Sequence, residues 1–283
     1  MPGAERQTDR PDADAARGGT PAPDTVLGNI PPGGIAVTEG DPLAGDYVLI
    51  CEHASNFIPP PLANLGLDTG DLGAHIAWDI GALDLARELS HRLGCGLIRA
   101  AVSRLVIDLN RPEGAIDLIP QVSETTPVPG NRDLDRAAIQ ARVSACYTPF
   151  HNRLREVFDA RVRAGRPTHI ISVHSFTPNY KGQDRSWHAG IIHDGKSDFA
   201  PRLLARLRGE PGLIVGENQP YTPADRVYHT LSVHGDARGL PTAMIEVRND
   251  CLGNRRDIGA WADRLAGAIS KAGDKGEARR EAV

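Results

Sequence analysis

Short apolar runs of strand length alternate along the chain with segments whose apolar residues recur at helical spacing. Residues 47–51 (YVLIC) form one such run, and residues 74–93 carry isoleucines and leucines at helical spacing before Gly94, which we expect to end the helix. The predicted strands are apolar on both faces, which is typical of a sheet covered by helices on both sides. The pattern therefore predicts an α/β fold with three layers, in which helices flank a mixed, mostly parallel sheet.

The same two patterns predict the remaining elements. Further strands are expected at residues 96–102, 105–107, 169–173, 189–193, 213–215 and 242–247. Further helices are expected at residues 134–164, with an interruption at Pro149, and at 198–207, 228–237 and 256–271.

Both ends of the chain lack hydrophobic periodicity. Residues 1–39 are rich in Pro, Gly, Ala, Asp and Arg, and residues 273–283 are similarly polar. Such segments cannot bury enough apolar surface to offset the entropy lost on ordering. We expect two disordered tails around a single α/β domain that spans residues 40–272.

Composition excludes several classes of partner. The formal net charge is −4, so neither nucleic acid nor an anionic membrane surface is an expected partner. No apolar run approaches the roughly 20 residues that cross a bilayer, and the N-terminus does not resemble a signal peptide. A cytoplasmic protein is expected, in which the four cysteines are reduced and mostly buried: Cys51, Cys95, Cys146 and Cys251.

Polar and ionisable residues follow four of the apolar runs. His53 follows residues 47–51, His174 follows 169–173, Glu246 ends the run at 242–247, and residues 108–111 (DLNR) follow 105–107. In α/β sheets, ligands bind beyond the carboxyl ends of strands. These residues are therefore expected to meet in one cleft.

Two of these residue types suit a catalytic metal. Histidines from different strand ends, such as His53 and His174, are typical zinc ligands, and catalytic zinc keeps one position open for water. A carboxylate beside that water can take and return its proton, a role that fits Glu246. The alternative is that the histidines are structural and that Glu246 pairs with Arg248.

Three arginines at or beside strand ends indicate an anionic substrate. A guanidinium binds a carboxylate through two parallel hydrogen bonds. The alternative for each arginine is an ion pair within the protein, with Asp79, Asp108 or Asp250. The arginines are Arg104, Arg111 and Arg248.

Six segments, taken in order, resemble the N-formylglutamate amidohydrolase family over roughly residues 47–252. They are CEHASNFIP (51–59), HIAWDIGA (75–82), SRLVIDLNRP (103–112), SVHSFTP (172–178), GENQPY (216–221) and MIEVRND (244–250). The resemblance implies hydrolysis of a small anionic N-acyl amino acid, with N-formyl-L-glutamate as the leading substrate. Another N-acyl amino acid or a peptide end is the alternative substrate, and a non-catalytic binding protein on the same fold is the second alternative.

A more distant likeness to zinc carboxypeptidases supports the same chemistry. It implies their phosphorylase/hydrolase-like fold, a metal (zinc) held by His53 and His174, and Glu246 as general base and acid. It also implies that Asn110 and Arg111 bind the substrate carboxylate.

One position departs from the carboxypeptidase pattern. Asn56 stands where those enzymes have a glutamate ligand, and an amide oxygen is a poor zinc ligand beside a carboxylate. Glu52, next to His53, can supply the missing oxygen, and so can Asp79. His234 is a further candidate for the cleft, whereas His75, His188, His193 and His229 receive no role from the sequence.

Overall fold

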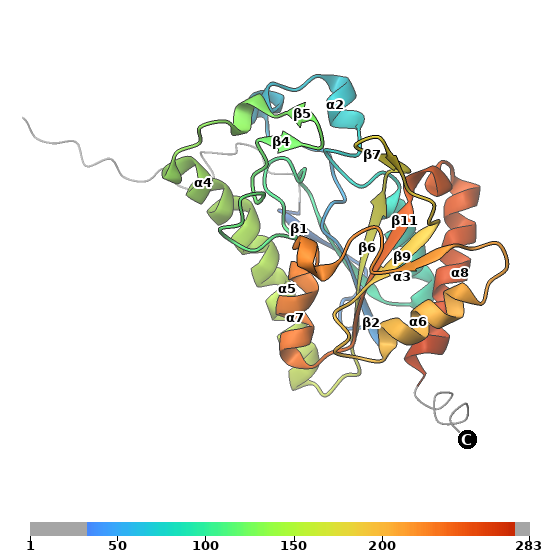
Figure 1. Cartoon of the computed structure of the whole chain (residues 1–283). Helices are drawn as coiled ribbons and strands as arrows, with labels where there is room; N and C mark the ends of the chain where they lie inside the picture. The colour runs from blue at the N-terminus through green and yellow to red at the C-terminus, as the bar shows by residue number, and fades with distance from the viewer. Residues whose placement is uncertain (1–32, 275–283) are drawn as a thin grey trace, which may run out of the picture.

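The computed structural model describes residues 33–274, and these form one mixed sheet with helices on both faces (Figure 1). The sheet has seven strands in the order β1-β3-β2-β6-β11-β9-β10. The β1–β3 and β11–β9 pairs are antiparallel, whereas β3, β2, β6 and β11 run parallel, and β9 and β10 pair parallel with each other. The strands are β1 (Ala36–Glu39), β2 (Tyr47–Cys51), β3 (Gly96–Ala100), β6 (His169–Phe176), β9 (Ala189–Ile192), β10 (Val215–Glu217) and β11 (Thr242–Arg248).

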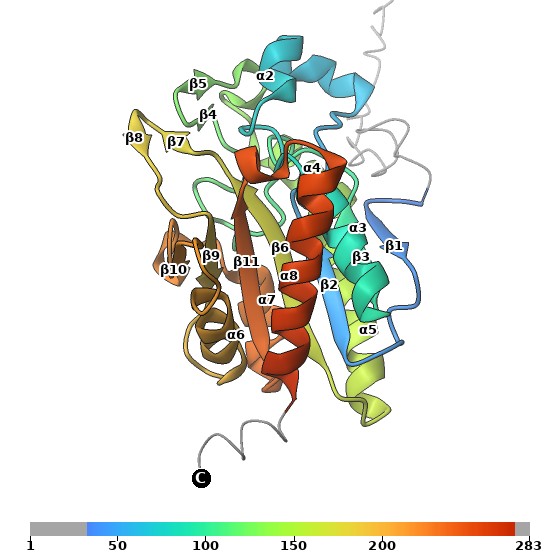
Figure 2. The same cartoon turned by 90° about the vertical axis from the view of Figure 1, so that its right-hand side faces the viewer.

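Two small hairpins lie outside this sheet, β4–β5 and β7–β8 (Figure 2). Their strands are β4 (Val122–Ser123), β5 (Thr126–Pro127), β7 (Asn179–Tyr180) and β8 (Gln183–Asp184). The helices are α2 (Thr69–Gly73), α3 (Ala82–Leu93), α4 (Arg136–Arg142), α5 (Thr148–Arg163), α6 (Phe199–Arg208), α7 (His229–His234) and α8 (Arg255–Gly273).

The core consists of two apolar clusters, one on each side of the sheet. Alternate residues of a strand point to opposite faces, so Val48 and Ile50 of β2 join one cluster while Leu49 and Cys51 join the other. Helix α5 packs on the first side, and α3, α6 and α8 pack on the second. The predicted three-layer α/β fold with a mixed, mostly parallel sheet is therefore confirmed.

The helix predicted at residues 74–93 begins only at Ala82. Gly81 has a φ of 81°, in the left-handed region, and a Cβ there would lie 2.7 Å from Leu252 Cβ. The preceding residues form turns instead, in which the amide of Asp79 donates to the carbonyl of His53 at 3.0 Å. This bond ties the segment before α3 to the end of β2, so the turn brings Asp79 to the strand ends.

The strand predicted at residues 105–107 is absent, although all three residues are buried. Side chains satisfy the backbone carbonyls that a neighbouring strand would otherwise satisfy. Asn131 donates to the carbonyl of Leu105 at 2.8 Å, and Arg142 donates to the carbonyl of Val106 at 3.0 Å. A buried apolar run with such partners needs no place in a sheet.

The predicted N-terminal tail was too long by one strand. Residues 36–39, assigned to the tail, form β1, an edge strand that pairs antiparallel with β3, and Ile35 before it is buried. The rest of that prediction, residues 1–32, lies outside the described residues, as does nearly all of the predicted C-terminal tail. None of the helices within residues 33–274 combines the length and apolar character needed to cross a bilayer.

Candidate active site

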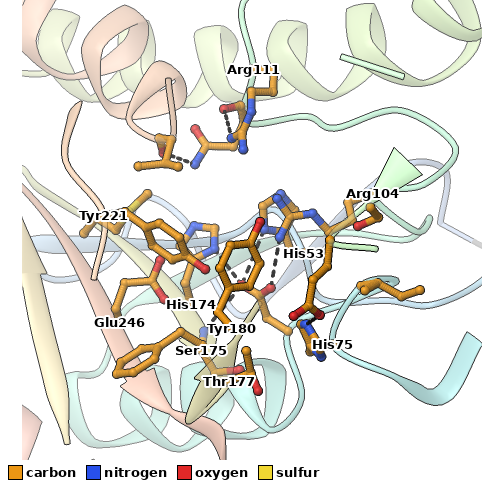
Figure 3. Close-up of a pocket in the computed structure, with 18 residues that line it drawn as sticks. His53, His75, Arg104, Arg111, His174, Ser175, Thr177, Tyr180, Tyr221 and Glu246 are labelled. Carbon is orange, nitrogen blue, oxygen red and sulfur yellow. Dashed lines mark hydrogen bonds and ion pairs between the residues drawn. The ribbon is translucent and has the colours of Figure 1, made fainter. Parts of the chain in front are cut away.

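The residues predicted at the strand ends do come together. His53 lies two residues after the end of β2, while His174 lies in β6 and Glu246 lies in β11. His174 and Glu246 are direct neighbours in the register of the two parallel strands. All three side chains are buried and line one pocket (Figure 3).

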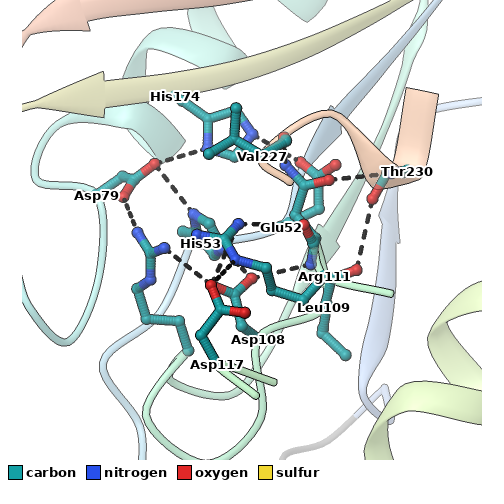
Figure 4. A network of polar contacts seen from close by, with 12 residues as sticks. Glu52, His53, Asp79, Asp108, Leu109, Arg111, Asp117, His174, Val227 and Thr230 are labelled. Carbon is teal, nitrogen blue, oxygen red and sulfur yellow. Dashed lines mark hydrogen bonds and ion pairs between the residues drawn. The ribbon is translucent and has the colours of Figure 1, made fainter. Parts of the chain in front are cut away.

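His53, Asp79 and His174 form a compact group that could hold a metal ion. One ligand atom from each of the three lies within 4.8 Å of the other two. Oδ2 of Asp79 is 2.7 Å from Nδ1 of His174 and 3.4 Å from Nδ1 of His53 (Figure 4). Nδ1 of His53 is buried and has no hydrogen bond within the described residues, so it is free to bind a cation.

The other nitrogen of each imidazole is held by a carboxylate. Nε2 of His53 lies 2.8 Å from Oδ1 of Asp108, and Nε2 of His174 lies 3.1 Å from Oε2 of Glu52. When Nε2 donates to such a carboxylate, Nδ1 is left with its lone pair, so both Nδ1 atoms are available to a metal. Ser172 holds Glu52 in place, because its hydroxyl donates to Oε2 at 2.7 Å. Glu52, which the sequence suggested as a metal ligand, thus contacts Nε2 of His174, whereas Asp79 contacts Nδ1 of the same ring.

Charge in this group favours a bound cation. Burial alone would raise the pKa of the Glu52 carboxyl, but the charge of His174 and the hydrogen bonds from His174 and Ser172 lower that pKa to about 2. Burial acts against ionisation of Asp79 as well, and the two histidines outweigh it, so the pKa of Asp79 is also lowered. These carboxylates in turn raise the pKa of His174 despite its burial. The buried carboxylates thus favour positive charge at this place in the pocket.

Glu246 differs from these carboxylates. Burial, the largest influence, raises the pKa of Glu246 to about 7. Its Oε2 atom is buried and accepts no hydrogen bond from any described residue. A carboxyl group with a pKa near neutrality that points into a pocket is suited to accept and release a proton.

The pocket around these groups is small and mostly polar. Its volume is about 120 Å³, well below the roughly 300–1,000 Å³ of pockets that bind drug-sized ligands. The hairpins β4–β5 and β7–β8 contribute Glu124 and Tyr180 to its wall. Oε2 of Glu124 lies 2.9 Å from Nε2 of His75, and Oε1 accepts from the amide of Lys181 at 2.7 Å, so Glu124 links the two hairpins.

Two of the three predicted arginines line the pocket. Arg104 forms ion pairs with Asp108 at 2.8 Å and with Asp79 at 3.5 Å. Nε of Arg111 lies 2.8 Å from Asp117 Oδ2. Both arginines therefore have partners within the protein while they face the pocket, and Nη2 of Arg111 makes no hydrogen bond to any described residue that would compete with a substrate.

The side-chain amide of Asn110 forms hydrogen bonds within the protein, although the residue lines the pocket. Its Nδ2 donates to the carbonyl of Val227, and its Oδ1 accepts from the amide of Thr230 at 3.0 Å. These bonds fix the start of α7 against residues 108–111. The predicted contact of Asn110 with a substrate carboxylate would compete with both.

Three further candidates lie outside the pocket lining. Asn56 donates to the carbonyl of Leu72 at 2.9 Å, and His234 stacks on His151 with its Nε2 2.9 Å from Nδ1 of that ring. Arg248 forms an ion pair with Asp250 at 2.8 Å, which is the alternative that the sequence offered to a role in substrate binding. Because Asn56 is outside the site, its difference from a glutamate leaves the His53–Asp79–His174 group intact.

The sequence analysis missed several residues of the wall. Tyr221 lines the pocket and accepts a hydrogen bond from Nη1 of Arg185 at 3.1 Å. The guanidinium carbon of Arg185 also lies 4.6 Å from the ring centre of Tyr180. The segment GENQPY, which contains Tyr221, was a signal for that residue, whereas no sequence pattern pointed to Arg185.

Comparison with known proteins agrees with this geometry. The family model for N-formylglutamate amidohydrolase matches residues 45–252. A crystal structure of a gene product from Agrobacterium tumefaciens is 43% identical, with a TM-score of 0.83 over 85% of this chain and 95% of that one. N-formylglutamate amidohydrolase from Ralstonia eutropha has the same fold, with a TM-score of 0.61 at 19% identity over 88% of this chain and 99% of that one. Curated proteins gave no match.

The family match includes every residue of the buried group. His53, Asp79, His174 and Glu246 all lie between residues 45 and 252, and they converge on one pocket at the strand ends. The chain is therefore a hydrolase that belongs to the N-formylglutamate amidohydrolase family.

Proposed function

We propose that this protein is a metal-dependent amidohydrolase that cleaves N-formyl-L-glutamate to formate and L-glutamate. The observation that carries the proposal is the pairing of the His53–Asp79–His174 group with Glu246 in one small pocket. Membership of the family supports an N-formylglutamate-like substrate. The small volume and the facing arginines support a compact anionic molecule over a polymer.

The proposed metal is a divalent cation, with zinc as the first candidate. His53 and His174 would hold it through Nδ1, and Asp79 would supply the oxygen ligand in place of the predicted Glu52. Two imidazoles and one carboxylate match the donor set of catalytic zinc sites that keep a position open. A cation bound there lowers the pKa of water toward neutrality and polarises a carbonyl group.

Glu246 is the proposed general base and acid. Its carboxylate takes a proton from the water that attacks the formyl carbon, and it gives that proton to the nitrogen of the departing glutamate. The C–N bond breaks in the second step, so formate and the free amine are the products. A pKa near 7 suits both transfers, because the group then gains and loses a proton at little cost near neutral pH.

Arg111 is the first candidate to bind a substrate carboxylate, and Arg104 is the second. Arg111 lies 2.8 Å from Asp117 and 3.8 Å from Asp108, and its Nη2 makes no hydrogen bond to a described residue, so it retains donors for a substrate. Arg104 is shared between Asp79 and Asp108, so it contributes mainly positive charge. Arg248 has no part in this proposal because it pairs with Asp250 away from the pocket.

The decisive experiment combines metal content with turnover. Purified protein is assayed for bound metal and for formate release from N-formyl-L-glutamate, alongside Glu246→Gln and the control Glu156→Gln. Glu156 is a surface glutamate on α5 whose side chain is 68% exposed. We expect near-stoichiometric metal in all three proteins and a loss of turnover of about 10²–10⁴-fold in Glu246→Gln alone.

Other outcomes would change the proposal in different ways. Metal without formate release would move the substrate to another N-acyl amino acid or a peptide end, which a separate measurement of amine release from such compounds tests. No metal and no turnover, even after incubation with zinc, would contradict the enzymatic proposal and favour a binding protein.

A further inference from the structure

Tyr221 places a phenol in the pocket on the same side as Glu246 (Figure 3). It follows β10, in a loop separate from the strands that carry the histidines. Burial and the nearby negative charge of Glu246 both raise the pKa of Tyr221, so the phenol stays protonated over the neutral range. The side chain is therefore a hydrogen-bond donor within reach of the pocket.

The contact with Arg185 fixes how Tyr221 uses its proton. A guanidinium can only donate hydrogen bonds, so in the 3.1 Å contact Nη1 of Arg185 donates and Oη of Tyr221 accepts. No other hydrogen bond of the Tyr221 hydroxyl exists within residues 33–274 of the structure. The O–H proton of Tyr221 is thus left for a ligand in the pocket.

Arg185 is itself held firmly. Its amide donates to the carbonyl of Pro178 at 2.8 Å, and its own carbonyl accepts from Nη1 of Arg248 at 3.0 Å. Its guanidinium carbon lies 4.6 Å from the ring centre of Tyr180 and 4.8 Å from that of Tyr221, close enough for cation–π attraction. These contacts orient the phenol before a substrate enters, and they give Arg248 a structural role behind Arg185.

We infer that Tyr221 is a further catalytic residue, which donates a hydrogen bond to the acyl oxygen of the substrate, and that Arg185 is a positioning residue for it. When water adds to the acyl carbon, the electron pair of the C=O bond moves to that oxygen. The Tyr221 O–H then faces a full negative charge, while its proton stays on the phenol. A donor fixed in advance stabilises this charge more than it stabilises the neutral carbonyl, so the effect falls on kcat.

This inference rests on the proposed hydrolysis, and its test uses the same formate-release assay with the full chain in its metal-bound form. The variants are Tyr221→Phe, Arg185→Gln and the double variant. Tyr228→Phe is the matched control, because that buried phenol bonds to Thr242 Oγ1 at 2.8 Å and lies outside the pocket lining. Metal content and thermal unfolding are measured for each, to confirm that all are folded and loaded.

We expect Tyr221→Phe to lower kcat by about 10²–10³-fold with KM almost unchanged, and Tyr228→Phe to behave like wild type. Arg185→Gln should lower kcat in wild type but add little in the Tyr221→Phe background, because its effect passes through the phenol. An additive loss would contradict the positioning role of Arg185. A change confined to KM, or no change, in Tyr221→Phe would overturn the role of Tyr221 while the proposed function stands. If wild type itself releases no formate or amine, both ideas fail together.

Discussion

His174 and Glu246 lie directly opposite each other on neighbouring parallel strands, and both are buried. The imidazole proposed to bind the metal and the carboxylate proposed to transfer the proton are thus fixed by the register of β6 and β11, which are adjacent in the middle of the sheet. A shift of this register by one residue would send one of the two side chains to the opposite face of the sheet. The site therefore depends on the sheet itself for its geometry.

Replacement of Glu246 by glutamine should stabilise the metal-free protein at high pH. The pKa of Glu246 is about 7 in the folded protein against an ordinary value of 4.5. The folded state holds this proton more tightly, so the contribution of Glu246 to the free energy of unfolding falls as pH rises from about 4.5 to about 7. Glutamine carries no such titration. We expect Glu246→Gln to exceed wild type by up to about 3 kcal/mol at pH 8 and to match it near pH 4.

Urea unfolding in the presence of a chelator, at pH 4, 6 and 8, checks this expectation. Glu156→Gln serves again as the control, since an exposed carboxyl should show no such pH dependence. A Glu246→Gln protein less stable than wild type at pH 8 would show that the buried carboxyl has a stabilising partner in solution.

Asp79 and Glu52 should respond differently to loss of charge. Asp79 lies between the two Nδ1 atoms, so Asp79→Asn removes a proposed ligand and should abolish tight metal binding. Glu52 contacts His174 at Nε2, the nitrogen away from Asp79, so Glu52→Gln should weaken metal affinity by about 10–100-fold, as loss of a supporting carboxylate does. Zinc titration with a competing chelator measures both constants. The reverse order would identify Glu52 as the third ligand, as the sequence first suggested.

Arg111→Lys should weaken substrate binding more than it slows the chemistry. Lysine keeps the charge but loses the planar fork that can bind Asp117 and a substrate carboxylate together. We expect KM for N-formyl-L-glutamate to rise by about tenfold, equivalent to ~1.4 kcal/mol, with a smaller change in kcat. Steady-state kinetics on Arg111→Lys and on the control Arg153→Lys test this, because Arg153 is a half-buried arginine of α5 that lies outside the pocket lining. Equal KM values in the two variants would exclude Arg111 from substrate binding.

Arg161→Met should destabilise the fold without a direct effect on the site. The Arg161 side chain is fully buried and forms no ion pair with a carboxylate within residues 33–274. It donates instead to Thr168 and to four backbone carbonyls, those of Pro42, Ala44, Gly45 and Pro167. Methionine leaves these acceptors buried and unsatisfied, so we expect a loss of at least about 3 kcal/mol in urea unfolding. Metal affinity of the folded fraction should be unchanged, and a stability equal to wild type would mean that water replaces the guanidinium.

The sequence predicted the parts of the site that the sheet carries. His53, His174 and Glu246 were found because each lies at the end of an apolar run, and strand ends meet at one edge of a parallel sheet. From the sequence, Asp79 was one of two candidates for the oxygen ligand of the metal. The sequence could not decide between them, because Asp79 reaches the site through a turn set by Gly81 and by a hydrogen bond to the carbonyl of His53. Local periodicity contains no information about such a contact.

The errors have the same origin. The buried run at 105–107 resembles a strand, and only the distant side chains of Asn131 and Arg142 make a non-sheet conformation favourable there. Arg185 could not be found at all, because its role depends on aromatic rings from separate segments, including Tyr180 and Tyr221. Contacts between segments far apart in the chain decide these features, and hydrophobic patterning reports mainly on neighbours.

The two hairpins have a consequence for how this protein can diverge. The groups proposed for chemistry belong to the sheet and the segments tied to it, whereas Glu124 and Tyr180 reach the pocket from β4–β5 and β7–β8, which share no hydrogen-bonded ladder with the sheet. Insertions or substitutions in these hairpins can reshape the pocket wall and leave the proposed reactive centre in place. Descendants of one ancestral hydrolase could in this way acquire different acyl amino acids as substrates through changes in two short ribbons.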